Sequence, residues 1–127
     1  MRIKILKEDF VVVKLENLEE VNIHDEFCFI SKTDEELSLV CTSRFTPTKC
    51  LDIQKGYRAF RINEKLDFNL IGVVAKITSL LALNEISVFV VSTFNTDYFL
   101  VKNAKLGRTM DILIANNYEI ENENEPN

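Results

Sequence analysis

The chain has 127 residues, which is enough for one ordinary domain or for two very small modules that share a core. Hydrophobic residues make up 46% of the sequence and charged residues 28%, so it is too apolar for an intrinsically disordered protein. No apolar run approaches the ~18 residues of a membrane span. The net charge of −5 disfavours nucleic-acid binding. Charges interrupt any secretory signal at the N-terminus, so we expect a folded cytoplasmic protein without nucleic-acid or membrane partners.

Short strands are predicted throughout the first half of the chain. Residues 3–6 and 10–15 are apolar segments separated by three charged residues, which predicts two strand pieces with a bend between them. Residues 18–25 carry mixed charges and predict a loop or a single helical turn, so a full-length helix is missing here. Residues 26–32 and 37–42 then predict a hairpin.

The middle of the chain predicts little helix and one further strand. Pro47 and its polar neighbours allow at most a short helix within residues 43–56, ending at Gly56. Residues 57–62 alternate in polarity and predict a strand with one polar face. Such a strand can serve as the seam between two halves of the chain.

Residues 66–101 predict one helix followed by a hairpin, and the rest of the chain is organised around them. Apolar residues recur at intervals of three and four over residues 70–81, the spacing that forms a stripe along one helix face. Residues 86–92 and 98–102 are rich in Val, Phe and Ile, which suit strands, and residues 95–97 supply the turn.

A second helix and a closing strand are predicted near the C-terminus. Asn103 suits the N-cap of a helix whose apolar stripe runs to Ile114. Residues 118–120 predict a short strand, and the acidic residues 121–127 predict a frayed, disordered tail. From residue 57 the order is strand, helix, strand, strand, helix, strand, which is ferredoxin-like. We therefore expect an α+β fold with both helices packed on an antiparallel sheet.

The joints between the first helix and the hairpin form a candidate binding site. A helix N-terminus has unpaired backbone N–H groups and partial positive charge, and Gly72 lies in the predicted first turn. This helix end can receive a carboxylate. Because the hairpin returns to the same sheet, we expect the hydroxyl of Thr93 and the carboxylate of Asp97 nearby. An α-amino acid carries both charges on one carbon, so it is the natural ligand class.

These residues also resemble a known family. LDFNLIGVVAKITSLLALNEISVF followed by STFNTDYFLV resembles the ACT-domain subfamily that contains small tandem-ACT bacterial proteins and the CASTOR arginine sensors. The resemblance is closest over residues 57–102, and STFNTD at 92–97 is its most specific piece. It implies βαββαβ modules that bind amino acids, often at interfaces. It also implies two subdomains, an abbreviated one at residues 1–60 and a second at residues 61–127.

The resemblance changes the interpretation of several residues. Judged alone, Asp97 is more simply a turn residue, Thr93 and Phe94 are ordinary strand residues, and Gly72 is a helix glycine that costs ~1 kcal/mol relative to Ala. In the family, the aligned positions contact the ligand, so the resemblance implies the same role for these residues. The expected ligand-binding residues are Leu70, Ile71, Gly72, Val73, Thr93, Phe94, Asn95 and Asp97.

The sequence departs from the arginine sensors at the site itself. Asn69, Leu70 and Ile71 stand where those sensors carry acidic and polar residues, and Asn95 and Thr96 replace a more basic and aromatic pair. A guanidinium group would lose partners here. Arginine specificity is therefore not implied, and a smaller or less basic amino acid is at least as suitable.

The remaining residue types indicate neither catalysis nor a metal or cofactor site. Cys28, Cys41 and Cys50 are far apart, without a C-x-x-C pair, and we interpret them as reduced, buried thiols. His24 lies in a charged stretch, and the sequence has no phosphate-binding glycine loop. We expect a non-enzymatic homodimer that binds a small amino acid at an ACT–ACT interface as a regulator or sensor. The alternatives are a ligand-free dimerisation module, or a detached regulatory subunit of a biosynthetic enzyme such as aspartate kinase.

Overall fold

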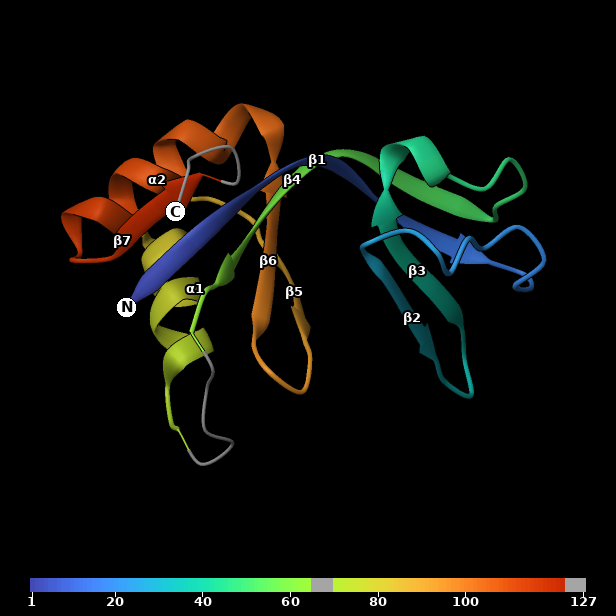
Figure 1. Cartoon of the computed structure of the whole chain (residues 1–127), viewed down its shortest axis with the longest axis horizontal. Helices are drawn as coiled ribbons and strands as arrows, with labels where there is room; N and C mark the ends of the chain where they lie inside the picture. Colours follow the sequence, from blue (N-terminus) through green and yellow to red (C-terminus); the bar gives the residue numbers. More distant parts are fainter. Residues whose placement is uncertain (65–69, 123–127) are drawn as a thin grey trace. The chain divides into compact units, whose positions relative to one another are not determined.

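The computed structural model describes residues 1–64 and 70–122. The contacts between residues divide the chain into two units. Unit 1 contains Met1–Lys7 and Arg58–Asn127, and unit 2 contains Glu8–Tyr57. Two strands, β1 (Arg2–Leu15) and β4 (Asp52–Ile62), contribute residues to both units (Figure 1). The units therefore interleave in sequence, and an independent subdomain at residues 1–60 stays a prediction.

Unit 1 has the predicted βαββαβ order, beginning with the second part of β4. A short 3-10 helix, η2, precedes the second α-helix. The elements after β4 are α1 (Val73–Leu83), β5 (Phe89–Ser92), β6 (Asp97–Lys102), η2 (Asn103–Lys105), α2 (Leu106–Ala115) and β7 (Glu119–Asn122).

The sheet of unit 1 has the strand order β7-β1-β4-β6-β5. Strands β5 and β6 form an antiparallel hairpin in which Phe89 pairs with Leu100. Strand β7 instead runs parallel to β1, with Arg2 opposite Glu119. The expectation of an antiparallel sheet is thus wrong at this pair, because β1 lies beside β4 and β7 takes β1 as its neighbour.

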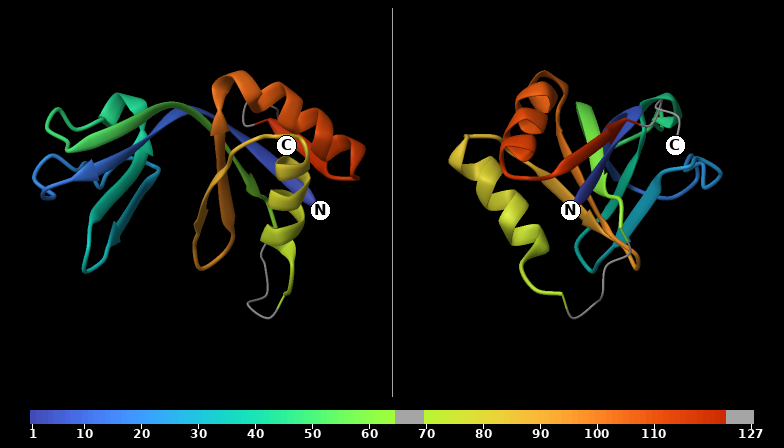
Figure 2. Two further views of the ribbon diagram at one scale, coloured as in Figure 1. Left: turned by 180° about the vertical axis from the view of Figure 1, so that it is seen from behind. Right: turned by 60° about the vertical axis from the view of Figure 1, so that its left-hand side comes forward.

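The two helices pack side by side on one face of this sheet (Figure 2). Alternate strand residues face them, so Phe60 and Phe99 stack with ring centroids 5.0 Å apart. Ile77 and Leu113, one from each helix, are fully buried in the same cluster. The spacing of apolar residues at intervals of three and four therefore correctly predicted which face of each helix packs on the sheet.

The boundaries of α1 differ from the expected range of residues 70–81. The helix begins at Val73, because Gly72 occupies the N-cap position with a left-handed φ of 84°. Leu70 therefore lies outside the helix and is exposed. At the other end, Glu85 also has a positive φ, 59°, and the chain leaves the helix there.

The start of α2 was also predicted incorrectly. Asn103 is not its N-cap, because residues 103–105 form η2 and Lys105 occupies the cap position without a capping side chain. Met110 and Leu113 are buried, whereas Ile114 is largely exposed. Strand β7 extends to Asn122, so the first two residues of the expected frayed tail are paired with β1, and residues 123–127 lie outside the described part.

Unit 2 is built from strands and loops. The hairpin of β2 (Cys28–Lys32) and β3 (Leu37–Thr42) agrees with the prediction. The first ten residues of the chain do not contain the expected bend, because β1 is one continuous strand. Between β3 and β4 the helix is a single 3-10 turn, η1 (Ser43–Phe45), and Gly56 lies within β4 with a φ of 80° rather than ending a helix.

The strands of the two units follow the same spatial order. Unit 2 has the order β4-β1-β3-β2, which is last, first, third, second in chain order. In unit 1 the strands of the βαββαβ segment follow the same order, β7-β4-β6-β5, with β1 inserted between the first two. Loops in unit 2 stand where unit 1 has α1 and α2.

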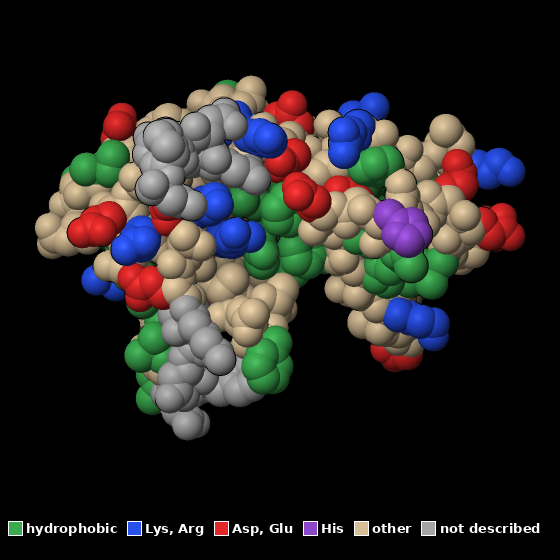
Figure 3. All heavy atoms as spheres, in the orientation of Figure 1, with side chains coloured by type: hydrophobic (Ala, Val, Ile, Leu, Met, Phe, Trp, Pro, Cys, Tyr) green, Lys and Arg blue, Asp and Glu red, His purple; other side chains and the backbone are tan. Residues whose placement is uncertain are grey.

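The described surface carries charges of both signs. Lysine and arginine side chains are interspersed with aspartate and glutamate side chains on the face shown in Figure 3. None of the described helices is long and apolar enough to cross a membrane.

Candidate functional site

A cavity of about 390 Å³ lies in unit 1 between the start of α1 and the turn that joins β5 to β6. We call it the helix–turn pocket. Its volume lies within the range of small-molecule sites, about 300–1,000 Å³. Its lining residues are Leu70, Gly72, Val73, Val74, Ala75, Ser92, Thr93, Phe94, Asn95, Thr96 and Asp97.

The helix–turn pocket brings together seven of the eight residues that the sequence suggested. The exception is Ile71, which is 94% exposed and lines a neighbouring cavity of about 310 Å³ together with Lys76 and Tyr118. The expected site did not include the lining residues Val74, Ala75, Ser92 and Thr96, although Ser92 and Thr96 belong to the STFNTD segment that carries the resemblance. The proximity of these residues is a structural finding, and their role in binding stays a prediction.

Among the described residues, no side chain caps the helix end that faces the pocket. Gly72 has no side chain to cap α1, and the first turn contains no acidic residue. The carbonyl of Gly72 accepts the hydrogen bond of the Lys76 N–H at 2.9 Å, which begins the helical ladder. The N–H groups of Val73 and Val74 belong to the first turn and have no intrahelical acceptor. The partial positive charge of the helix end is therefore directed at the pocket without a protein anion from that turn.

The opposite wall is a turn held rigidly by its own residues. Thr93 donates from its N–H to the carbonyl of Thr96 at 2.8 Å and from its hydroxyl to the same oxygen at 3.0 Å. The hydroxyl of Thr96 donates to the carbonyl of Ile62 at 2.7 Å, which ties the turn to β4. The Thr93 hydroxyl thus has a turn-forming role, and its proton is not directed at a ligand.

Asp97 supplies the negative charge of the pocket. It is the first residue of β6, and its Oδ1 accepts a hydrogen bond from the hydroxyl of Ser92 at 2.6 Å. Its Oδ2 accepts none from the described residues. Among those that line the pocket, Asp97 is the single charged side chain. The pocket therefore has a positive helix end on one wall and a carboxylate on the other.

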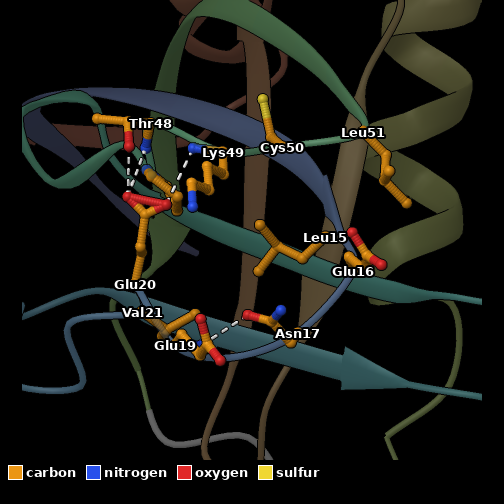
Figure 4. A pocket seen from close by; sticks show the side chains of 11 residues that line it. Leu15, Glu16, Asn17, Glu19, Glu20, Val21, Thr48, Lys49, Cys50 and Leu51 are labelled. Atoms are coloured by element: carbon orange, nitrogen blue, oxygen red, sulfur yellow. Dashed lines mark hydrogen bonds between the residues drawn. The ribbon is translucent and has the colours of Figure 1, made fainter.

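A larger cavity of about 480 Å³ lies in unit 2, between residues 15–21 and 47–51 (Figure 4). Two of its backbone donors, the N–H groups of Thr48 and Lys49, already bind a carboxylate of the chain itself. The carboxylate of Glu20 accepts hydrogen bonds from the N–H of Thr48 at 3.1 Å, from the Thr48 hydroxyl at 2.5 Å and from the N–H of Lys49 at 3.0 Å. These hydrogen bonds hold the pKa of Glu20 below its usual value, and the bond from the Thr48 hydroxyl has the largest effect. The helix–turn pocket is therefore the better candidate for an anionic ligand group.

Comparison with known families identifies the fold that positions this pocket. Residues 52–115, half of the chain, match the ACT domain. The chain belongs to the ACT-domain family. The match begins at β4 and ends with α2, so it contains the whole helix–turn pocket. The ACT domain is a regulatory, non-catalytic module.

Solved structures share the fold of this ACT-domain protein. A protein from Agobacterium tumefaciens is 29% identical, with a TM-score of 0.85 over 99% of this chain and 96% of that one. A Vibrio cholerae protein of unknown function, described as a possible transport protein, is 17% identical, with a TM-score of 0.72 over 87% and 85%. A chain from a structure of aspartokinase alpha and beta subunits is 12% identical, with a TM-score of 0.60 over 91% and 96%. No curated protein matches the sequence.

Proposed function

We propose that this ACT-domain protein binds a small α-amino acid in the helix–turn pocket, without catalysis, and transmits its occupancy to a partner or to its own assembly. The observation that carries the proposal is the pairing of an uncapped helix N-terminus with one carboxylate across a cavity of about 390 Å³. ACT domains typically bind amino acids in regulatory roles. We expect this role to be performed in the cytoplasm.

The carboxylate of the ligand is assigned to the start of α1. Gly72 and Val73 place backbone N–H groups beside the cavity, and the helix dipole favours an anion there. The first turn has no acidic residue to compete for these groups. A ligand carboxylate would thus supply the missing cap.

The amino group of the ligand is assigned to Asp97. Ser92 occupies Oδ1, so Oδ2 is the oxygen proposed to accept a hydrogen bond from the ammonium group. A hydrogen bond to a charged group contributes roughly 1.5–3 kcal/mol. Phe94 and Leu70 add apolar surface around the opening, which suits a small uncharged side chain. The resemblance to the arginine sensors therefore supports an amino acid as the ligand class, but it does not support arginine as the ligand.

The finer architecture in this proposal is a tandem of ACT units. The common strand order of the two units supports unit 2 as an abbreviated copy whose helices have been replaced by loops. ACT domains often hold their ligands at interfaces between units. We propose that a second chain completes the opening of the helix–turn pocket, as in the CASTOR-like arrangement that the sequence resembles.

The first test is a thermal-shift screen of the twenty amino acids followed by calorimetry on those that raise the Tm. The variant Asp97→Asn keeps an oxygen for Ser92 and removes the charge, so we expect it to weaken binding at least tenfold with unchanged circular dichroism. The matched control is Asp34→Asn, an exposed acidic residue in the β2–β3 turn of unit 2. Equal affinities of Asp97→Asn and wild type would refute the assignment of Asp97.

One alternative has an observation in its favour. The fold similarity to a chain of nearly equal length in the aspartokinase structure supports a detached regulatory subunit of an amino-acid biosynthetic enzyme. Association with a kinase catalytic chain that changes with amino-acid concentration, measured by co-elution, would favour this role. A silent screen would instead favour a ligand-free dimerisation module.

A further inference from the structure

Two cysteines in unit 2 lie directly opposite each other. In the antiparallel pair of β2 and β3, the register places Cys28 beside Cys41. Residues opposite each other in a sheet project from the same face, and both cysteines belong to the core cluster that contains Val11 and Leu39. Cys41 is 2% exposed and Cys28 is partly exposed. The two thiols are therefore neighbours at the edge of this core.

The hydrogen-bond pattern of the hairpin defines the geometry of this pair. Thr33 donates from its N–H to the carbonyl of Glu36 at 2.9 Å, so these residues form a hydrogen-bonded pair at the turn. Hydrogen-bonded and non-hydrogen-bonded pairs alternate along an antiparallel ladder. Counting from the turn through the uninterrupted register makes the pair of Cys28 and Cys41 non-hydrogen-bonded. Such pairs have Cα atoms about 4.5 Å apart, which lies within the ~4.4–6.8 Å that a disulfide spans.

The surroundings of the thiols make them slow to react and keep them neutral. Burial raises the pKa of Cys28, and Asp25 raises it further. Burial, with smaller contributions from Asp25 and Cys28, raises the pKa of Cys41 to about 12. Since the thiolate is the reactive form, the pair requires a disulfide oxidant in excess. Cys28 is the more accessible of the two and would react first.

We propose that Cys28 and Cys41 form a reversible disulfide across β2 and β3 by exchange with a low-molecular-weight disulfide such as oxidised glutathione. The Cys28 thiolate attacks one sulfur of the oxidant, forms a mixed disulfide and expels one thiolate. The Cys41 thiolate then attacks the sulfur of Cys28 and expels the second. The protein loses two protons and two electrons, and the oxidant is reduced to two thiols. Strands β2 and β3 remain paired, so the product needs no change of register.

Cys50 provides an internal control. It lies on the segment between η1 and β4 and lines the large cavity of unit 2, and the strand register gives it no cysteine partner. It is a free, partly buried thiol like Cys28. The proposal therefore requires that the cross-link forms without Cys50.

The test is intact mass spectrometry with peptide mapping of the full chain after incubation with oxidised glutathione at about pH 8.5. We expect wild type and Cys50→Ser to lose two hydrogens, ~2 Da, with Cys28 and Cys41 in one linked peptide, and dithiothreitol to reverse the change. Cys41→Ser should stop at a glutathione adduct on Cys28, because the resolving thiol is absent. A cross-link that includes Cys50, or adducts without any internal disulfide in folded wild type, would overturn the proposal. The wild-type peptide map decides the question even if Cys41→Ser does not fold.

Discussion

Gly72 and Gly56 have nearly the same backbone conformation in different surroundings. Their φ angles are 84° and 80°, and no heavy atom of the described residues lies within 4 Å of a Cβ built at either position. A non-glycine residue in this left-handed region costs about 1–2 kcal/mol at both sites. Only Gly72 lines the helix–turn pocket. Substitutions at the two glycines can therefore distinguish the effect of backbone strain from the effect of blocking a ligand.

We predict that Gly72→Ala and Gly56→Ala lower the free energy of unfolding by similar amounts, about 1–2 kcal/mol each. Gly72→Ala should also weaken amino-acid binding by about tenfold or more, because a Cβ at the N-cap stands in the approach of the carboxylate to the first N–H groups. Denaturant unfolding and calorimetry measure the two effects. Equal affinity in both variants would remove Gly72 from the site.

The stability of unit 2 is expected to depend on pH through Glu20. Its folded-state pKa is lowered by the hydroxyl of Thr48 and by two backbone N–H groups. A lowered pKa means that the carboxylate form stabilises the fold, so this contribution is complete above the unfolded-state value of about 4.5 and is lost as the pH falls through the folded-state value.

We therefore predict that Glu20→Gln is less stable than wild type at pH 7 and that the difference shrinks at about pH 3, because protonation removes the same interaction from wild type. Urea unfolding at the two pH values measures the difference. Glu19→Gln is the control, since Glu19 lines the same cavity and its carboxylate accepts no hydrogen bond from the described residues. A pH-independent difference would show that packing, and not charge, holds this loop.

At the residue scale, the proximity of the candidate site residues was predictable and their conformation was not. The sequence indicated that Gly72 and Asp97 would meet, because a helix end and a hairpin turn on one sheet return to the same place. It did not indicate that Gly72 is the N-cap. Glycine adopts left-handed and right-handed backbone conformations freely, so its presence alone does not predict the φ of 84°. The bond from Ser92 to Asp97 also depends on a strand register that the sequence does not specify.

At the element scale, the existence and the buried faces of the helices were predictable because their apolar residues repeat with one period, whereas their first residues were not. The strands β1 and β4 were predicted too short. Strand β1 pairs with β7 through Arg2 and its near neighbours and with β3 from Phe10 onward, so its two ends have different partners. A change of partner along one strand leaves no mark in local sequence, and the charged residues between the two segments suggested a bend instead.

Helix α1 allows a direct test of the core. Ile77 is fully buried against the sheet, whereas Leu83 on the same helix is 81% exposed. We predict that Ile77→Ala lowers the free energy of unfolding by ~2–5 kcal/mol, because transfer energy and packing contacts are both lost. Leu83→Ala should change it by no more than about 0.5 kcal/mol. Similar denaturation midpoints for the two variants would show that Ile77 does not face the core.

At the scale of the whole molecule, the relation between the two units could not be read from the sequence. The halves lack visible identity, and the likeness lies in the order of strands, last, first, third, second. In unit 1 the space beside the sheet is filled by α1 packed on α2. In unit 2, hydrogen bonds from Thr48 and Lys49 to Glu20 join the two loops that follow β1 and β3. Hydrogen bonds from two loops to one carboxylate leave no periodic pattern in the sequence. The sequence therefore indicated only that a helix is missing here.

The surface around the helix–turn pocket exposes large apolar side chains. Ile71 and Phe94 are 94% and 75% exposed, and Leu70 is half exposed. Leu70 and Phe94 line the helix–turn pocket, and Ile71 lines the neighbouring cavity. Exposed apolar side chains beside a cavity are typical of surfaces that another protein covers. One such surface on each of two chains forms a C₂ interface, in which the same patch contacts itself. In the proposed function, Leu70 and Phe94 at the pocket would link the dimer interface to ligand binding.

We therefore predict a homodimer with twice the 14.7 kDa mass of the chain at micromolar concentration, measured by light scattering after gel filtration. Ile71→Ser and Phe94→Ser should shift the protein toward the monomer, because each removes apolar area from the proposed interface. Ile23→Ser, which replaces an exposed apolar residue of unit 2, should leave the mass unchanged. Binding that requires the dimer would become weaker on dilution through the dissociation range, whereas a pocket complete in one chain would keep its affinity. A wild-type monomer both with and without amino acids would refute the homodimer.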